Sequence, residues 1–359
     1  MVEIAALPED LLRSIKHDVN RSRLRAKNAL KVIAGSGPPS GTSPKDTIWS
    51  FGDIQLWRYR SDRRTHRTPL LIVHSLVTRS YVFDLSPGNS FVEYMLDRGF
   101  DVYLVDWGTP DERAAHYDFG TYCGQFIPEI VRATVDASDD DEVVILGYCL
   151  GGLLSLLYAA ANVGDPIRAL AVMATPVNFR HMGVIGKMLH GGRVSPQSLL
   201  DHTGNVPSDA VRDSFRMMQP SVEITGYADL WQHLWNDEFV AGYQIMTRWG
   251  TDHIPLAGGL VIELARMIQS DEIANGRVVL GGREVTLRDI CVPFLGIIAE
   301  RDHLVPRAAT EGVADMVGSE DSTELVLPAG HVGVFLGRSA QKKCLPAITE
   351  WIEKQMETR

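Results

Sequence analysis

The chain has 359 residues, of which 45% are hydrophobic and 22% are charged, a composition that supports a large globular core. Its formal net charge of −10 disfavours a general nucleic-acid-binding role. Residues 1–30 lack the apolar stretch of a secretory signal, and no window of 18 residues is uninterruptedly apolar. We therefore expect no transmembrane segment and a cytoplasmic location. Four scattered cysteines predict neither a disulfide framework nor a metal site.

The first segment, from Glu9 to about Ala34, is predicted to be helical because apolar residues recur at helical spacing. These residues are Leu11, Leu12, Ile15 and Val19. The segment carries seven Lys or Arg residues and three acidic residues, which favours a solvated surface helix. A docking helix for an acidic partner or an apolar particle surface is the alternative. Residues 35–44, GSGPPSGTSP, predict a flexible linker. We therefore assign residues 1–44 to the helix and linker, and residues 45–359 to a catalytic domain.

Beyond the linker, short apolar runs alternate with helical patterns. The expected strands are Leu70–Val73, Val102–Val105, Val143–Leu146, Ala169–Met173, Phe294–Ile298 and Glu324–Leu327. The expected helices cover residues 89–97, 121–136, 151–162, 308–317 and 338–356. Apolar strands separated by amphipathic helices predict an α/β fold, with a mostly parallel central sheet and helices on both faces. The alternation stops between about Val177 and Glu284, and we expect an inserted, mostly helical cap at about residues 177–285.

The strongest chemical signal is the run VVILGYCLGG, residues 143–152, in which a strand leads through G-x-C-x-G into a helix. This is the nucleophile elbow of α/β hydrolases with Cys149 in place of serine. The turn is so tight that the positions two before and two after the nucleophile must be small. The following helix starts at the nucleophile, and its dipole favours a thiolate. A buried structural thiol is the alternative for Cys149, and the flanking glycines weigh against it.

A catalytic triad on this fold needs an acid after a later strand and a histidine after the last strand. Asp302 follows the expected strand at 294–298, and His331 follows the expected strand at 324–327. Singly, Asp302 could cap a helix and His331 could be an ordinary loop histidine, but their joint order is that of the fold. Asp106 is the alternative acid, although we favour a role for it in supporting the end of its strand. His303 is the second choice of histidine.

The oxyanion formed during acyl transfer needs backbone donors. The first expected donor is the N–H of Leu150, directly after the nucleophile. The second should come from the loop after the strand at 70–73, and both Leu76 and Val77 are candidates there.

With these loops located, the chain resembles poly(3-hydroxyalkanoate) synthases, and most closely the short catalytic subunits of the class III type. The resemblance extends over about residues 45–356, is loose in the cap and hardly includes the N-terminal helix. It differs from the expected form at His74, Ser75 and Thr78. The stretches that carry it are Leu76–Leu85, Gly99–Gly108, Gly147–Gly152, Ala299–Pro306 and Gly330–Gly333, with a weaker likeness at Arg277–Ile290.

The resemblance implies an acyltransferase of the α/β-hydrolase fold that polymerises 3-hydroxyacyl-CoA into a polyester. It implies that Cys149 carries the acyl group, that His331 is its base and that Asp302 is the third member. It also implies a homo- or hetero-oligomer with an accessory synthase subunit and association with polyester granules. No bound cofactor is expected, since coenzyme A leaves as a product. The rival interpretation is a cysteine-dependent thioesterase or a small-molecule acyltransferase of the same fold, which differs only in the acceptor. A non-enzymatic binding module would be expected to lack a triad member, and none is missing.

Overall fold

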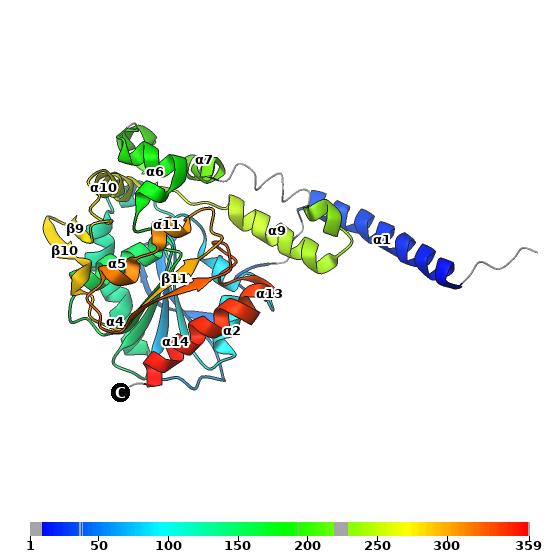
Figure 1. The fold of residues 1–359 in the computed structure, drawn as a ribbon, viewed down its shortest axis with the longest axis horizontal. Coiled ribbons are helices and arrows are strands. Elements are labelled where there is room, and N and C mark those ends of the chain that lie inside the picture. Colours follow the sequence, from blue (N-terminus) through cyan, green and yellow to red (C-terminus); the bar gives the residue numbers. More distant parts are fainter. Residues whose placement is uncertain (1–8, 36, 38, 193, 219–228, 358–359) are drawn as a thin grey trace, which may run out of the picture. The chain divides into compact units, whose positions relative to one another are not determined.

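The computed structural model describes residues 9–35, 37, 39–192, 194–218 and 229–357 (Figure 1). The chain separates into two compact units. The helical unit comprises Met1–Ser40 and Pro220–Thr251, and the sheet unit comprises Gly41–Gln219 and Asp252–Arg359. Residues 220–251, which lie inside the expected cap, thus group with the N-terminal helix. No helix in the described part of the chain has the length and apolar composition that a membrane crossing needs.

The sheet unit is built on eight strands. They are β1 (Lys45–Phe51), β2 (Ile54–Tyr59), β3 (Pro69–Val73), β4 (Asp101–Asp106), β5 (Val143–Tyr148), β6 (Ile167–Met173), β11 (Phe294–Ala299) and β12 (Ser322–Leu327). Their order in the sheet is β1-β2-β4-β3-β5-β6-β11-β12. From β4 to β12 neighbouring strands are parallel, whereas β1, β2 and β4 pair antiparallel. Strand β5 therefore lies inside the sheet, and every one of its residues is buried.

Helices cover both faces of this sheet, with α4 and α5 on one side and α2 and α14 on the other (Figure 1). The covering elements are α2 (Phe91–Leu96), α3 (Phe119–Thr121), the π-helical turn η3 (Tyr122–Phe126), α4 (Ile127–Ala137), α5 (Leu150–Ala161), α11 (Arg307–Thr310), α12 (Val313–Met316), α13 (Gly337–Ser339), the π-helical turn η7 (Ala340–Cys344) and α14 (Leu345–Glu357). Because both faces are covered, the inner strands are apolar on both sides, which is why they read as continuous apolar runs.

All six expected strands form, with bounds that differ from the expected ones by no more than two residues at either end. The expected helix at 308–317 is instead two short helices, because Gly312 takes a left-handed conformation with φ 88° between them. The expected helix at 121–136 begins earlier, where Asp118 caps the first turn of α3 and accepts a hydrogen bond from the N–H of Thr121. The antiparallel β1–β2 edge was not among the expected elements.

The part of the expected cap that belongs to the sheet unit is mostly helical, as expected, and also contains short strands. Its helices are η4 (Phe179–His181), α6 (Gly183–His190), η5 (Pro196–Leu199), α7 (Ser208–Met218) and α10 (Gly258–Gln269), and η6 (Leu287–Asp289) follows just after the cap. Its strands form two small sheets, β7 (Asn205–Val206) with β8 (Leu256–Ala257) and β9 (Arg277–Leu280) with β10 (Arg283–Thr286). The β9–β10 hairpin was not among the expected elements, although its sequence carries a hairpin signal. Gly281 and Gly282 form its turn, and both have positive φ.

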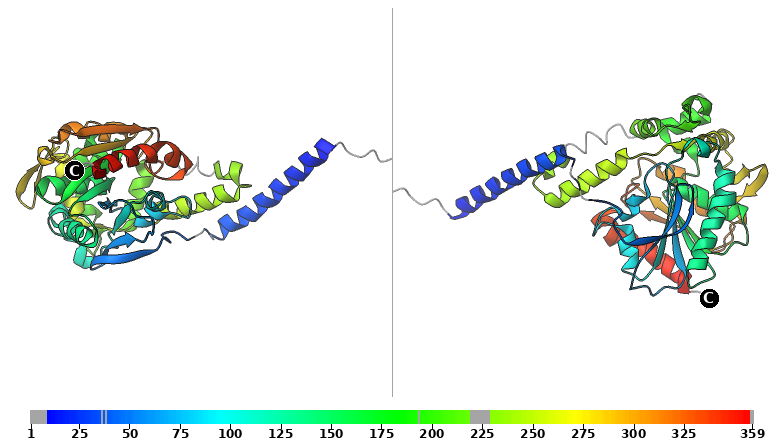
Figure 2. Two further views of the ribbon diagram at one scale, coloured as in Figure 1. Left: turned by 90° about the horizontal axis from the view of Figure 1, so that it is seen from below. Right: turned by 180° about the vertical axis from the view of Figure 1, so that it is seen from behind.

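The helical unit pairs α1 (Glu9–Ile33) with α9 (Asp237–Thr251), which lie side by side (Figures 1 and 2). Leu230, Leu234 and Val240 form its buried core. The buried amide of Asn28 donates a 2.9 Å hydrogen bond to the carbonyl oxygen of Leu234. The Arg21 guanidinium lies over the Trp235 ring, 4.2 Å from its centroid. The remaining short helices of the sheet unit are η1 (Ser80–Asp84) and η2 (Glu112–Ala114).

Candidate active site

Cys149 occupies a sharp turn between β5 and α5, inside the sheet. Its backbone has φ 54° and ψ −121°, a conformation that L-residues rarely adopt. The N–H of Cys149 is held by the carbonyl oxygen of Met173 on β6 at 2.9 Å. The residue is partly exposed, unlike the strand that precedes it. The turn therefore lifts the thiol out of the sheet while its backbone stays anchored to it.

The glycines around Cys149 are required by close backbone contacts. A Cβ atom on Gly147 would lie 2.6 Å from the Cα atom of Gly152, and a Cβ on Gly151 would overlap the carbonyl oxygens of Val73 and His74. No side chain fits in either place. The G-x-C-x-G spacing is thus a packing requirement of this turn, as expected from the sequence.

Helix α5 begins at Leu150, directly after the nucleophile, and runs for 12 residues. The first N–H groups of a helix lack intrahelical partners, and together with the helix dipole they favour negative charge at this end.

Asp302 and His331 come together as the sequence predicts, although they lie on different loops. Oδ2 of Asp302 is 2.6 Å from Nδ1 of His331. The other carboxylate oxygen, Oδ1, accepts hydrogen bonds from the N–H groups of Leu304 at 2.8 Å and Val305 at 2.9 Å. Both side chains are buried. The carboxylate is therefore fixed in one orientation, and it fixes the imidazole ring.

Cys149 is the third member of this cluster. Burial lowers the pKa of His331, but the charge of Asp302 and then the charge of Cys149 outweigh it, and the hydrogen bonds to both residues raise the pKa further. The net effect is a raised pKa, which favours an imidazolium. Because Nδ1 faces Asp302, the ring's Nε2 is left to serve Cys149. The three residues thus have the connectivity that nucleophile, base and orienting acid require.

The alternative acid and histidine do not join this cluster. Oδ1 of Asp106 accepts a 2.8 Å hydrogen bond from the N–H of Gly108, and Oδ2 accepts one from the hydroxyl of Ser80. Asp106 therefore supports the end of β4, as favoured from the sequence. His303 is exposed to solvent. In the described part of the chain, no three His, Cys, Asp or Glu side chains are arranged to hold a metal ion.

Comparison with known proteins decides the family. Residues 68–337 match the α/β-hydrolase fold model, and residues 9–95 match the model for the N-terminus of poly-beta-hydroxybutyrate polymerase (PhaC). The chain is 34% identical over 362 residues to the poly(3-hydroxyalkanoate) polymerase subunit PhaC of Allochromatium vinosum, covering 99% of this chain and 100% of that one. It is 33% identical to the corresponding subunit of Haloferax mediterranei, covering 89% of this chain and 65% of that one.

The chain belongs to the poly(3-hydroxyalkanoate) polymerase family. The N-terminal helix, which the sequence resemblance hardly included, lies within the matched polymerase N-terminus.

Solved structures agree on the fold of this polymerase-family chain. The monoacylglycerol lipase of Paleococcus ferrophilus superposes with a TM-score of 0.50 at 17% identity, covering 84% of this chain and 99% of that one. A thermophilic esterase from Thermogutta terrifontis gives 0.51 at 14% identity, covering 88% of this chain and 100% of that one. These similarities establish the α/β-hydrolase fold alone.

The loop expected to supply the second oxyanion donor of this polymerase-family chain runs from His74 to Thr78. Its first carbonyl, that of His74, faces Gly151 in the elbow and accepts a 2.7 Å hydrogen bond from the indole N–H of Trp107. Leu76 is buried and Val77 partly buried. The structure thus brings this loop to the elbow, while the choice between the Leu76 and Val77 amides stays a prediction.

Two residues of the polymerase site were missed by sequence analysis. The ring of Tyr148, the residue before the nucleophile, lies 5.0 Å from the His331 ring between centroids, and its hydroxyl donates to the His331 carbonyl oxygen at 3.4 Å. His74 is buried with Nε2 2.9 Å from the Thr78 carbonyl oxygen. Tyr148 directly precedes the nucleophile, and His74 begins the loop expected to supply the oxyanion donor. These neighbouring positions are the sequence signal that could have identified them.

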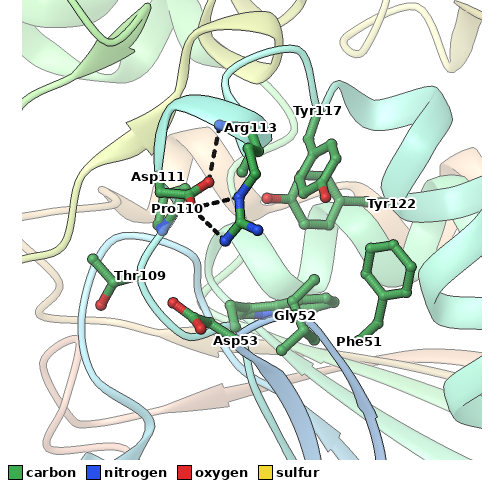
Figure 3. A pocket seen from close by; sticks show the side chains of 12 residues that line it. Phe51, Gly52, Asp53, Thr109, Pro110, Asp111, Arg113, Tyr117 and Tyr122 are labelled. Carbon is green, nitrogen blue, oxygen red and sulfur yellow. Dashed lines mark hydrogen bonds and ion pairs between the residues drawn. The ribbon is translucent and has the colours of Figure 1, made fainter.

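A separate cavity of about 280 Å³ lies between the β1–β2 turn and the loop after β4 (Figure 3). Its walls include Phe51, Trp107, Tyr117 and Tyr122, and its rim carries Arg113 bound to Asp111. None of Cys149, Asp302 and His331 lines it.

Proposed function

We propose that this chain polymerises 3-hydroxyacyl-CoA into poly(3-hydroxyalkanoate) through an acyl thioester on Cys149. The observation that carries the proposal is the buried Asp302–His331 pair beside a partly exposed thiol on the elbow, in a chain of the polymerase family. No bound cofactor takes part in this scheme, and coenzyme A is the leaving group of the substrate.

The first step transfers the acyl group to the enzyme. The His331 ring takes the thiol proton through Nε2, and the Cys149 sulfur attacks the thioester carbonyl. The C–S bond to coenzyme A breaks, and the proton on His331 passes to the departing thiolate. The Leu150 N–H and an amide of the 74–78 loop stabilise the oxyanion. Asp302 orients the imidazole and stabilises its charged form.

The second step extends the chain. His331 takes the proton of an incoming 3-hydroxyl group, whose oxygen attacks the acyl carbon on Cys149. The C–S bond to Cys149 breaks and an ester bond forms, returning the proton to the thiolate. A thioester on cysteine keeps the acyl group activated for this attack, whereas serine would already form an oxyester. Water competes with the hydroxyl at this point, so the site must exclude it.

The test uses purified full-length chain and 3-hydroxybutyryl-CoA, with coenzyme A release and polymer followed together. Polymer formed in step with coenzyme A release supports the proposal. Release with free 3-hydroxybutyrate instead would identify a thioesterase, and release only when a small alcohol is added would identify a small-molecule acyltransferase. Either result would overturn it.

We propose further that the helical unit binds an accessory synthase subunit, and that the assembled enzyme acts at polyester granules in the cytoplasm. In support, α1 is rich in Lys and Arg while the whole chain is strongly acidic. The same unit exposes large apolar side chains, with Ile33 82%, Trp231 74% and Leu30 68% exposed. We expect low specific activity for the chain alone. Full activity of chain purified without any co-expressed partner would contradict this.

A further inference from the structure

The chain enters the sheet unit at two described junctions, 40/41 and 251/252. Within the sheet unit, the residues just beyond both junctions bind to one short segment, Thr78–Asp84. This segment directly follows the loop at 74–78 that faces the nucleophile elbow. The two junctions are 211 residues apart in sequence, so their convergence is a property of the fold.

The first junction is fixed to the end of this segment. The N–H of Gly41 donates a 2.7 Å hydrogen bond to the carbonyl oxygen of Asp84. The buried Asp84 carboxylate accepts from the N–H of Ser43 at 2.8 Å and from its hydroxyl at 2.7 Å. Ser90 donates to the same carboxylate at 2.9 Å. A buried carboxylate with three donors holds the incoming chain firmly in place.

The second junction is fixed to the start of the segment. The carboxylate of Asp252, the first residue after the junction, is 3.4 Å from Nε of Arg79 and accepts a 3.0 Å hydrogen bond from the hydroxyl of Tyr81. The next residue, His253, forms a backbone bridge with Thr78. The N–H of Ile254 then reaches the carbonyl oxygen of Val77 at 3.4 Å.

The loop that these contacts reach is also held from within. Burial lowers the pKa of His74 to about 4, so its imidazole is neutral near pH 7. Its Nε2 lies 2.9 Å from the carbonyl oxygen of Thr78, and as an N–H it donates to that carbonyl. Residues 74–78 are therefore clamped by His74 on the inner side and by residues 252–254 on the outer side. Val77, a candidate oxyanion donor, lies between the two clamps.

We infer that Asp252 is a positioning residue for acyl transfer. Its carboxylate accepts hydrogen bonds from both Arg79 and Tyr81, and it thereby sets the path of the backbone that carries Val77. The inference rests on the proposed acylation of Cys149.

Asp252 is expected to act by holding the loop in place rather than through its charge. The Asp252 side chain is 39% exposed, and an ion pair at that exposure contributes little to stability. Its loss should therefore leave the fold intact. A small displacement of an oxyanion donor, by contrast, costs about 10-fold or more in rate.

The experiment compares the full-length variants Asp252→Ala, Asp252→Asn and Asp46→Ala in rapid-quench acyl loading with 3-hydroxybutyryl-CoA. Asp46 is the matched control, since it is an exposed aspartate paired with Arg60 on the β1 edge. We expect Asp252→Ala to lower the loading rate constant about 10-fold with a less than twofold change in substrate Kd. Asp252→Asn keeps an acceptor for Tyr81 and should recover part of the rate. Asp46→Ala should match the parent chain.

A second measurement addresses the loop directly. Hydrogen exchange of peptides covering residues 74–84 should become faster in Asp252→Ala and stay unchanged in Asp46→Ala.

The outcomes separate this inference from the proposed function. A parent chain that never loads Cys149 removes the proposed function, whatever the exchange data show. A parent chain that loads normally while Asp252→Ala behaves like Asp46→Ala in rate and exchange overturns the role of Asp252.

Discussion

Replacing Asp302 by Asn should separate the two chemical steps. Oδ1 of Asp302 accepts two backbone N–H groups, those of Leu304 and Val305. An asparagine keeps its oxygen on those donors and turns its NH₂ group toward Nδ1 of His331. Nδ1 must then accept, which places the ring proton on Nε2, where the base is needed. The variant therefore keeps the geometry but holds the wrong tautomer.

The cost of this change differs between the steps. An unassisted thiol is ionised to a few per cent at pH 7, so loading of Cys149 should slow by no more than about 30-fold. A hydroxyl group is not appreciably ionised at pH 7, so its attack depends on the base. Elongation should therefore slow by about 10⁴-fold, as in other triads whose histidine is held in the wrong tautomer.

The assay is rapid-quench loading of Cys149 with one equivalent of 3-hydroxybutyryl-CoA, followed by a second addition that starts elongation. Asp106→Asn is the matched control, since Asp106 also sits at a strand end and accepts a backbone N–H, but has no contact with His331 in its hydrogen bonds. Equal slowing of both steps in Asp302→Asn would refute the division of labour. A selective loss of elongation in Asp106→Asn would show that the wrong acid has been assigned.

Three further predictions concern the same site. Cys149→Ala should abolish acyl transfer with an unchanged far-UV circular dichroism spectrum, and Cys149→Ser should leave little turnover; retained turnover in the alanine variant would remove the whole mechanism. Gly151→Ala should lower the melting temperature sharply, because the new Cβ overlaps the carbonyl oxygens of Val73 and His74; a normal melting curve would contradict the packing argument. The pKa of His331 is raised from 6.5 to about 10. The parent chain should therefore be more stable than Asp302→Asn, with the difference fully present below pH 6.5 and lost as the pH rises through 10. Urea unfolding of both proteins at pH 6 and pH 10 measures this difference.

The sequence was sufficient where one local rule decided the structure. The parallel strands are buried on both faces and therefore appear as apolar runs. The glycines of the elbow cannot be replaced, because any side chain there would overlap neighbouring atoms. The pairing of Asp302 with His331 followed from the order of motifs along the fold. The catalytic roles of these residues and the choice between Leu76 and Val77 are still predictions.

Other features depended on contacts that a local pattern does not contain. Strand β1 alternates weakly, with partly buried and exposed residues but none fully buried, and it is defined by its pairing with β2. The grouping of residues 220–251 with α1 reflects long-range contacts, among them the buried bond from Asn28 to Leu234, across 206 residues. The role of His74 depends on the turn that brings Thr78 back to it.

That long separation has a consequence for synthesis. Helix α1 is made well before α9, which completes its core and ends at Thr251. At about 5–20 residues per second, translation leaves α1 without this packing for roughly 10–45 s. During that interval a basic, amphipathic helix is free to bind ribosomal RNA, anionic lipid or a chaperone. Moving the N-terminal segment to the C-terminus by circular permutation would remove the delay, and the yield of folded protein would report how much it matters.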